Sequence, residues 1–119
     1  LAGVVTVGKE KCRARSTSSI FAVERIIAIE AKVSATQRAL EQACANTWFS
    51  SESHALLPRP RTAERLMGVA SSLGVGLLGF EDDRVARVCE ASVRAVPLSY
   101  GSWLFNEWTW RVARNTGAI

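Results

Sequence analysis

Residue types that build metal and disulfide sites are scarce in this chain of 119 residues. His54 is the single histidine, which argues against a histidine metal site in this sequence. The three cysteines, Cys12, Cys44 and Cys89, form no Cys-x-x-Cys pair, so neither a zinc site nor a disulfide framework is indicated. Isolated thiols of this kind are typical of a reducing compartment, and we expect a cytoplasmic protein.

Long apolar segments are also missing. No run approaches the roughly 20 apolar residues that cross a bilayer, and residues 1–5 lack the basic and apolar regions of a signal peptide. We therefore expect no membrane partner. The length fits a single domain over residues 1–119. The net charge of +4 and the pI of 9.4 are compatible with DNA or RNA as a partner.

The most informative stretch is residues 26–33, in which Glu30 and Lys32 lie two residues apart in an otherwise apolar, β-branched run. In a strand, alternation places both charged side chains on one face. The other face would carry the apolar side chains of Ile27, Ile29, Ala31 and Val33. Because charges inside such a strand cost solvation free energy, the pattern indicates an ion pair, a metal ligand or a chemical role.

The neighbouring segments predict a mixed α/β fold. Residues 20–23 read as a short strand that would form an antiparallel hairpin with residues 26–33. Ser34 and Gln37 have the spacing of a capping box, so a helix should begin at Ser34 and end near residue 49. A strand follows at residues 53–57, and the strand–helix–strand order predicts a right-handed crossover between parallel strands.

The second half of the chain continues this pattern. A helix capped by Thr62 should lead into a buried strand at residues 74–80, and an Asp-Asp turn should lead into a strand at residues 84–91. Residues 103–112 favour a helix, although their alternation also fits a strand. The predicted fold class is α/β, with a mixed central sheet, a βαβ unit and flanking helices.

The run Ile-Ala-Ile-Glu-Ala-Lys at residues 27–32 resembles the signature strand of the PD-(D/E)XK nuclease-like superfamily. Residues 39–43 resemble the helix in which some members carry a glutamine, here Gln42, and residues 56–58 and 74–78 resemble later core strands. The resemblance runs from about residue 19 to residue 88. It implies a restriction-endonuclease-like core and a nucleic-acid substrate.

The same resemblance implies a chemistry for these residues. Phosphodiester hydrolysis uses a hard divalent cation that neutralises charge and activates water. Glu30 would therefore bind Mg²⁺ or Mn²⁺, Lys32 would act at the phosphate, and Gln42 would reach back to the site.

Two departures from the superfamily pattern limit this chemistry. Its metal-binding aspartate lies on the preceding strand, but residues 15–20 contain no acidic residue, and Ser18 or Ser19 takes that position. The first helix of the fold is also missing. We therefore expect weak nuclease activity or none. Glu10 and Glu24 are the substitutes to consider.

Each motif also has a structural interpretation. Glu30 and Lys32 fit a simple ion pair on a strand, and Gln42 fits an ordinary surface position. An alternating basic run fits either a solvated edge strand or a strip of phosphate contacts. This basic run consists of Lys9, Lys11, Arg13 and Arg15.

The C-terminal tryptophans support a second hypothesis about function. Trp103, Trp108 and Trp110 fit a core, a subunit interface or a base-stacking surface. Two hypotheses result. The first is a nucleic-acid-acting domain with a degenerate active site. The alternative is a non-catalytic assembly module that forms a homodimer through these tryptophans.

Overall fold

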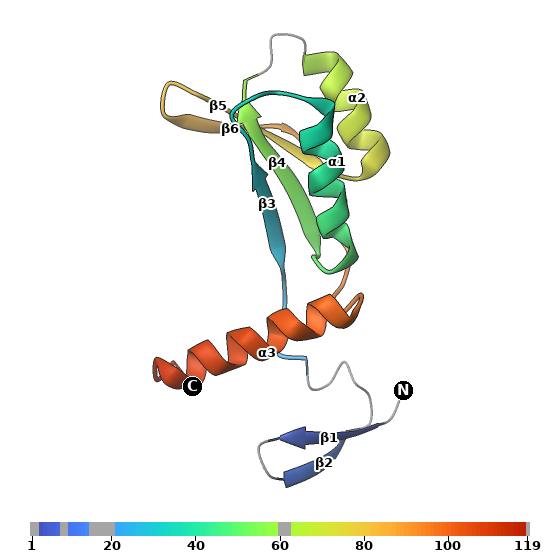
Figure 1. Ribbon diagram of the computed structural model, residues 1–119, viewed down its shortest axis with the longest axis vertical. Helices are drawn as coiled ribbons and strands as arrows, with labels where there is room; N and C mark the ends of the chain where they lie inside the picture. The colour runs from blue at the N-terminus through green and yellow to red at the C-terminus, as the bar shows by residue number, and fades with distance from the viewer. Residues whose placement is uncertain (1–2, 8–9, 15–20, 60–62, 119) are drawn as a thin grey trace.

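The computed structural model describes residues 3–7, 10–14, 21–59 and 63–118. Four strands form a mixed sheet in the order β3-β4-β5-β6, and two more form a separate antiparallel hairpin, β1-β2 (Figure 1). In chain order the elements are β1 (Gly3–Val7), β2 (Glu10–Ala14), β3 (Ile27–Ala31), α1 (Gln37–Ala45), the 3-10 turn η2 (Asn46–Trp48), β4 (Glu52–Pro58), α2 (Ala63–Leu73), β5 (Gly76–Glu81), β6 (Arg84–Cys89) and α3 (Tyr100–Asn115).

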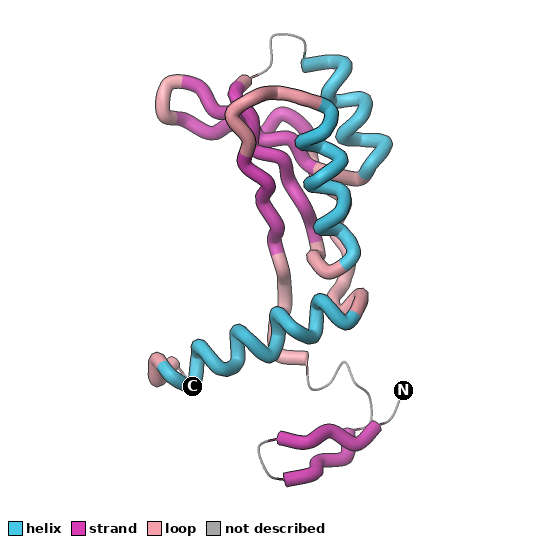
Figure 2. Tube along the Cα trace, in the orientation of Figure 1, coloured by secondary structure: helices cyan, strands magenta, loops and turns pink. Residues whose placement is uncertain are grey.

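The central sheet confirms the predicted mixed α/β class. Strands β3, β4 and β5 are parallel, and β6 returns antiparallel to β5. Both crossovers, through α1 and through α2, step along the sheet in the same direction. Right-handed crossovers of this kind place both helices on one face, as Figure 2 shows. The result is a two-layer arrangement of helices on a sheet.

The hydrophobic core lies between this sheet face and the two helices. Small side chains on α1 let the helix approach the sheet closely, and the Ser53 hydroxyl donates a hydrogen bond of 2.6 Å to the Ala43 carbonyl oxygen. Because Ser53 faces α1, every second residue of β4 also faces the core. The buried cluster comprises Ala39, Leu40, Ala43, Ala55, Leu57, Leu66, Ala70, Val75 and Leu77.

The opposite face of the sheet is covered over Glu52 and His54 of β4 but open and partly apolar over β3. The strand register places Ile27 beside Glu52 and Ile29 beside His54, on the side that points away from the core. The two isoleucines are 49% and 55% exposed, and Phe80 on β5 is 41% exposed. The predicted alternation in β3 is therefore present, but its apolar side is the open one.

Two local predictions were wrong. Residues 21–26 form no strand, because the backbone N–H groups of Ala22 and Val23 donate hydrogen bonds of 2.7 and 3.1 Å to Oδ1 of Asn106 on α3. A distant helix thus takes the donors that a hairpin would need. The N-cap of α1 is Thr36 rather than Ser34, and α1 ends at Ala45.

The C-terminal segment is a helix, as predicted, and lies across one end of the sheet (Figure 1). Its first turns hold it in place. The Ser102 hydroxyl donates a hydrogen bond of 2.7 Å to the Phe49 carbonyl oxygen, and the Phe105 and Phe49 rings stack with centroids 4.8 Å apart. Within the described ranges, no helix has both the length and the apolar character needed to cross a membrane.

Candidate functional site

Glu30 and Lys32 lie together at the carboxyl end of β3. Their side chains form an ion pair with 2.9 Å between Nζ and Oε1. Glu30 is in register with Ala55, so both charged groups lie on the helix-covered side of the sheet. Their side chains remain 29% and 40% exposed, because β3 is the outermost strand. The predicted shared face is confirmed, and solvent reaches both groups.

Gln42 is held on α1, which follows β3 in the crossover. Its side chain is half-buried. Among the hydrogen bonds of the described residues, none joins Gln42 to Glu30 or Lys32. The structure therefore brings two of the three predicted catalytic residues into contact, and Gln42 remains a neighbour in the same βαβ unit.

A metal site needs more donors than this cluster offers. In the described part of the chain, no group of three or more His, Cys, Asp or Glu side chains could hold a metal ion. Magnesium is usually held by one or two carboxylates together with phosphate oxygens and water. Glu30 is a single carboxylate that already pairs with Lys32. These residues do not fit a resident Mg²⁺ or Mn²⁺ ion.

Two residues of the predicted basic strip lie in strand β2. Lys11 and Arg13 take alternate positions in this strand, opposite Thr6 and Val4 of β1. Lys9 and Arg15 lie outside the described residues. Glu10, one of the two substitute acids, begins β2, and Glu24, the other, is exposed in the segment before β3. Glu24 forms no ion pair with Lys32 among the described residues.

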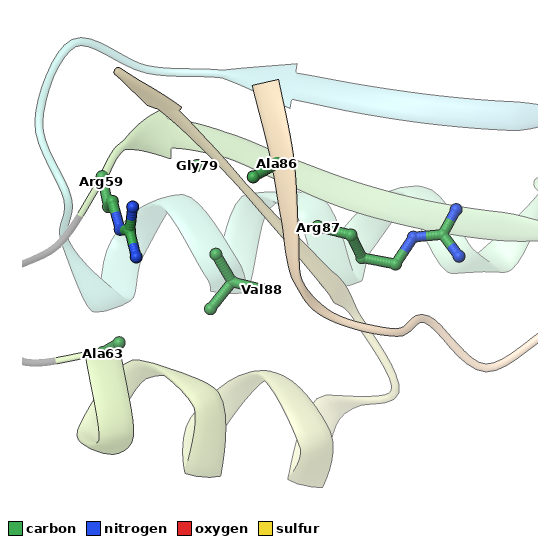
Figure 3. A pocket seen from close by; sticks show the side chains of 6 residues that line it. All are labelled: Arg59, Ala63, Gly79, Ala86, Arg87 and Val88. Carbon is green, nitrogen blue, oxygen red and sulfur yellow. The ribbon is translucent and has the colours of Figure 1, made fainter. Parts of the chain in front are cut away.

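A small pocket lies at the carboxyl ends of β4 and β5 (Figure 3). Gly79 forms part of its wall, where a Cβ atom would lie 3.3 Å from Val88 Cγ2. Arg59 and Arg87 lie on either side of Val88 in this view. Each arginine pairs with a glutamate: Arg59 with Glu81 at 3.3 Å, and Arg87 with Glu90 at 3.5 Å. The pocket is therefore lined by charges that are already compensated.

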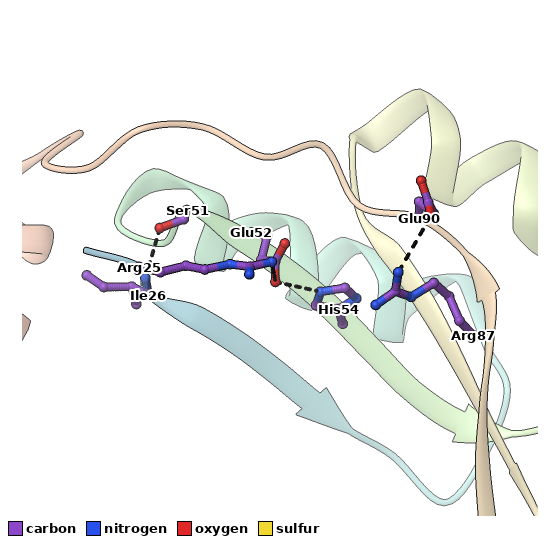
Figure 4. Close-up of polar contacts among 7 residues, drawn as sticks. All are labelled: Arg25, Ile26, Ser51, Glu52, His54, Arg87 and Glu90. Carbon is purple, nitrogen blue, oxygen red and sulfur yellow. Dashed lines mark hydrogen bonds and ion pairs between the residues drawn. The ribbon is translucent and has the colours of Figure 1, made fainter. Parts of the chain in front are cut away.

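A second charged cluster was missed by sequence reasoning. Glu52 is almost fully buried at the start of β4 and accepts a hydrogen bond of 2.7 Å from Arg25. The same oxygen lies 3.5 Å from Nε2 of His54 (Figure 4). The hydrogen bond from Arg25 is the main reason that the pKa of Glu52 lies below its ordinary value, and burial opposes this shift. The cluster ties residues 25–26 to β4.

His54 fills the space above a glycine. A Cβ atom on Gly76 would collide with Nδ1 of His54, and Ala91 lies against the same position. Nδ1 is buried and has no hydrogen-bond partner. The sequence signal for this cluster is the alternation of Glu52 and His54 in a strand that is otherwise small and apolar. The predicted strand began one residue too late to include Glu52.

The three C-terminal tryptophans differ in their surroundings. Trp103 packs edge to face on Phe21 with centroids 5.1 Å apart. Trp108 is 63% exposed and Trp110 is 40% exposed. Trp103 therefore packs against another residue of the same chain. Trp108 has a larger exposed fraction than Trp110.

Comparison with known protein families, with curated proteins and with solved structures found no match for this chain.

Proposed function

We propose that this chain is a nucleic-acid-binding domain with a nuclease-like site that does not cleave efficiently. The observation that carries the proposal is the contact between Glu30 and Lys32 at the carboxyl end of β3. The two side chains lie in a strand–helix–strand unit, as the PD-(D/E)XK resemblance implies. Both are open to solvent, so Lys32 is within reach of a phosphate group.

Charge supports the choice of partner. The chain carries a net charge of +4, and its N-terminal hairpin places Lys11 and Arg13 at alternate positions of one strand. The arginines around the pocket are paired with glutamates, so they add less free positive charge. We propose that the basic strip of β2 contacts the phosphate backbone and that Lys32 adds a further contact.

We do not expect this site to cleave nucleic acid efficiently. In the superfamily pattern that residues 27–32 resemble, an aspartate on the preceding strand and the glutamate of the signature strand together hold the divalent ion. Glu30 alone does not provide that pair, and its nearest charged neighbour is Lys32. Binding without cutting is the activity that the charges at this position support best.

The test is a fluorescence-anisotropy titration of labelled single-stranded and duplex DNA and RNA at several salt concentrations. Binding through phosphates releases counterions, so the logarithm of the affinity should fall linearly with the logarithm of the salt concentration. The double variant Lys11→Gln/Arg13→Gln should reduce the magnitude of that slope by about 2, because each phosphate contact contributes about 1.

A matched control removes the same charge elsewhere. Arg65 on α2 and Arg114 on α3 are exposed, and Arg65→Gln/Arg114→Gln changes the net charge by the same amount. This control should leave the slope nearly unchanged. No binding at low salt, or equal losses in both double variants, would overturn the proposal.

A further inference from the structure

The outer edge of β3 is an unpaired strand edge. β3 is the last strand of the sheet on its side, and among the described strands only β4 pairs with it. Its sequence from Ile27 to Ala31 contains two β-branched residues and no proline. Free N–H and C=O groups on such an edge are a ready template for another strand.

Helix α3 offers a second free surface on the same side. Leu104, Trp108 and Val112 are spaced by four residues, so they form one stripe along the helix. They are 51%, 63% and 40% exposed. In Figure 1 the helix passes below the start of β3, and its C-terminal half continues beyond the outer edge of that strand. We call this half, residues 108–115, the α3 overhang.

From this arrangement we propose that two copies of the chain form a dimer by antiparallel pairing of their β3 edges, centred on Ile29. A two-fold axis then relates the copies, and the interface is self-complementary. In this register Ile29 lies opposite Ile29 of the second copy. Ile27 lies opposite Ala31 of the second copy.

Charge repulsion favours this register over the one that is centred on Glu30. Centring on Ile29 places Glu30 opposite Ala28 of the second copy, so no carboxylates face each other. Centring on Glu30 would place two carboxylates directly opposite each other, which destabilises a pair of strands. Pairing around Ile29 also uses the whole length of β3, because Ile29 is its middle residue.

The α3 overhang fits the same dimer. Antiparallel pairing brings the carboxyl end of β3 from the second copy down toward the overhang. Val33 follows that end and is 93% exposed, so it would pack against Leu104 and Trp108. The partly exposed apolar side chains of this surface provide on the order of 600 Å² per copy, close to the ~800 Å² per partner of a standard interface.

Cysteine cross-linking tests the register. Two Ile29→Cys positions would face each other across the two-fold axis, at a distance that suits a disulfide. Two Ile27→Cys positions would be offset by about 13 Å along the strands and should not cross-link. Both variants keep the same native cysteines, so background oxidation is matched. Mild oxidation should therefore give a covalent dimer with Ile29→Cys only.

Sedimentation velocity without nucleic acid tests the interface independently. The unmutated chain should dimerise in the micromolar range, and Trp108→Glu should weaken dimerisation at least about tenfold. Val85→Glu is the matched control, because Val85 is 59% exposed on β6 at the far side of the sheet. It should leave the dimer intact.

Three outcomes would overturn the dimer. These are a monomer at tens of micromolar, equal cross-linking at positions 27 and 29, and equal weakening by Trp108→Glu and Val85→Glu. A monomer would mean that the β3 edge does not pair with a second copy of the chain. None of these results bears on DNA or RNA binding, which is measured separately.

Discussion

At the residue scale, the pair of Glu30 and Lys32 bears both on the stability of β3 and on its proposed function. Nζ of Lys32 and Oε1 of Glu30 lie 2.9 Å apart, but both side chains remain partly exposed. Exposed pairs of this kind contribute about 0–1 kcal/mol to stability. The pair therefore explains little of the stability of the fold.

Replacing Glu30 should not remove a nuclease activity, because Glu30 pairs with Lys32 and has no second carboxylate beside it among the described residues. We expect no efficient Mg²⁺- or Mn²⁺-dependent cleavage of plasmid or oligonucleotide by the unmutated chain. Gel assays of the unmutated chain and of Glu30→Ala should look alike. Efficient cleavage that disappears in Glu30→Ala would contradict this expectation and would call for a second acidic ligand, with Glu10 considered first and Glu24 second.

The buried carboxylate of Glu52 should make stability depend on pH. The hydrogen bond from Arg25 lowers its pKa in the folded chain. The unfolded chain therefore binds a proton at a higher pH than the folded chain does, so Glu52 stabilises the fold above its ordinary pKa of 4.5. This contribution is lost as the pH falls from that value through the lowered pKa.

Urea unfolding at a series of pH values from neutral to acid measures this loss. In Glu52→Gln the free energy of unfolding should fall less steeply below pH 4.5 than in the unmutated chain. Arg25→Gln removes the main cause of the lowered pKa, so the loss should be smaller and should be complete at a higher pH than in the unmutated chain. Identical pH profiles for all three proteins would show that the pKa of Glu52 is not lowered in the folded chain.

At the element scale, the seating of α3 depends on a close approach at Gly101. A Cβ atom there would lie 2.7 Å from Cη2 of Trp48 and 2.9 Å from Cβ of Phe49. Since Phe49 is part of the backbone turn that receives the Ser102 hydrogen bond, it has little freedom to move. The helix therefore needs glycine at this position.

Two glycine substitutions should have opposite effects. Gly68 lies within α2, and a Cβ atom there would meet nothing within 4 Å. Gly68→Ala should stabilise the chain by about 0.5–1 kcal/mol, because alanine has the higher helix propensity. Gly101→Ala has the same propensity advantage but should destabilise by about 1–3 kcal/mol through overpacking. Urea denaturation of both variants checks the sign, and stabilisation by Gly101→Ala would show that α3 is not seated as described.

At the scale of the whole molecule, stability should be unevenly distributed. β4 is paired on both sides, and its Ala55 and Leu57 side chains are fully buried. α3 is anchored by Ser102, Phe105 and Asn106 in its first turns, and its overhang has an exposed apolar stripe. Regions with few buried contacts open most readily.

Amide hydrogen exchange should reflect this distribution. The amides of β4 should exchange most slowly, and those of the α3 overhang should exchange fastest among the helices. If the chain dimerises as proposed, amides on the outer edge of β3 and in the overhang should become more protected as the protein concentration rises. Uniform protection across β4 and α3 would contradict the uneven distribution.

The sequence by itself determined the elements whose signals are local. Alternation in residues 27–31 placed Glu30 on one side of a strand and the isoleucines on the other, because strand geometry depends on nearest neighbours. The order of strand, helix and strand determined the parallel crossover, because its handedness is nearly invariant. The helical character of residues 63–73 and the turn at Asp82 and Asp83 were also predicted correctly.

Only the tertiary structure decided which side of β3 is covered. That choice depends on the direction in which both crossovers step along the sheet, and no local pattern encodes it. The absence of a strand at residues 21–23 is also a tertiary effect, because Asn106, more than 80 residues away, accepts hydrogen bonds from the backbone N–H groups of Ala22 and Val23. The cluster of Arg25, Glu52 and His54 likewise exists only because β3 and β4 lie side by side.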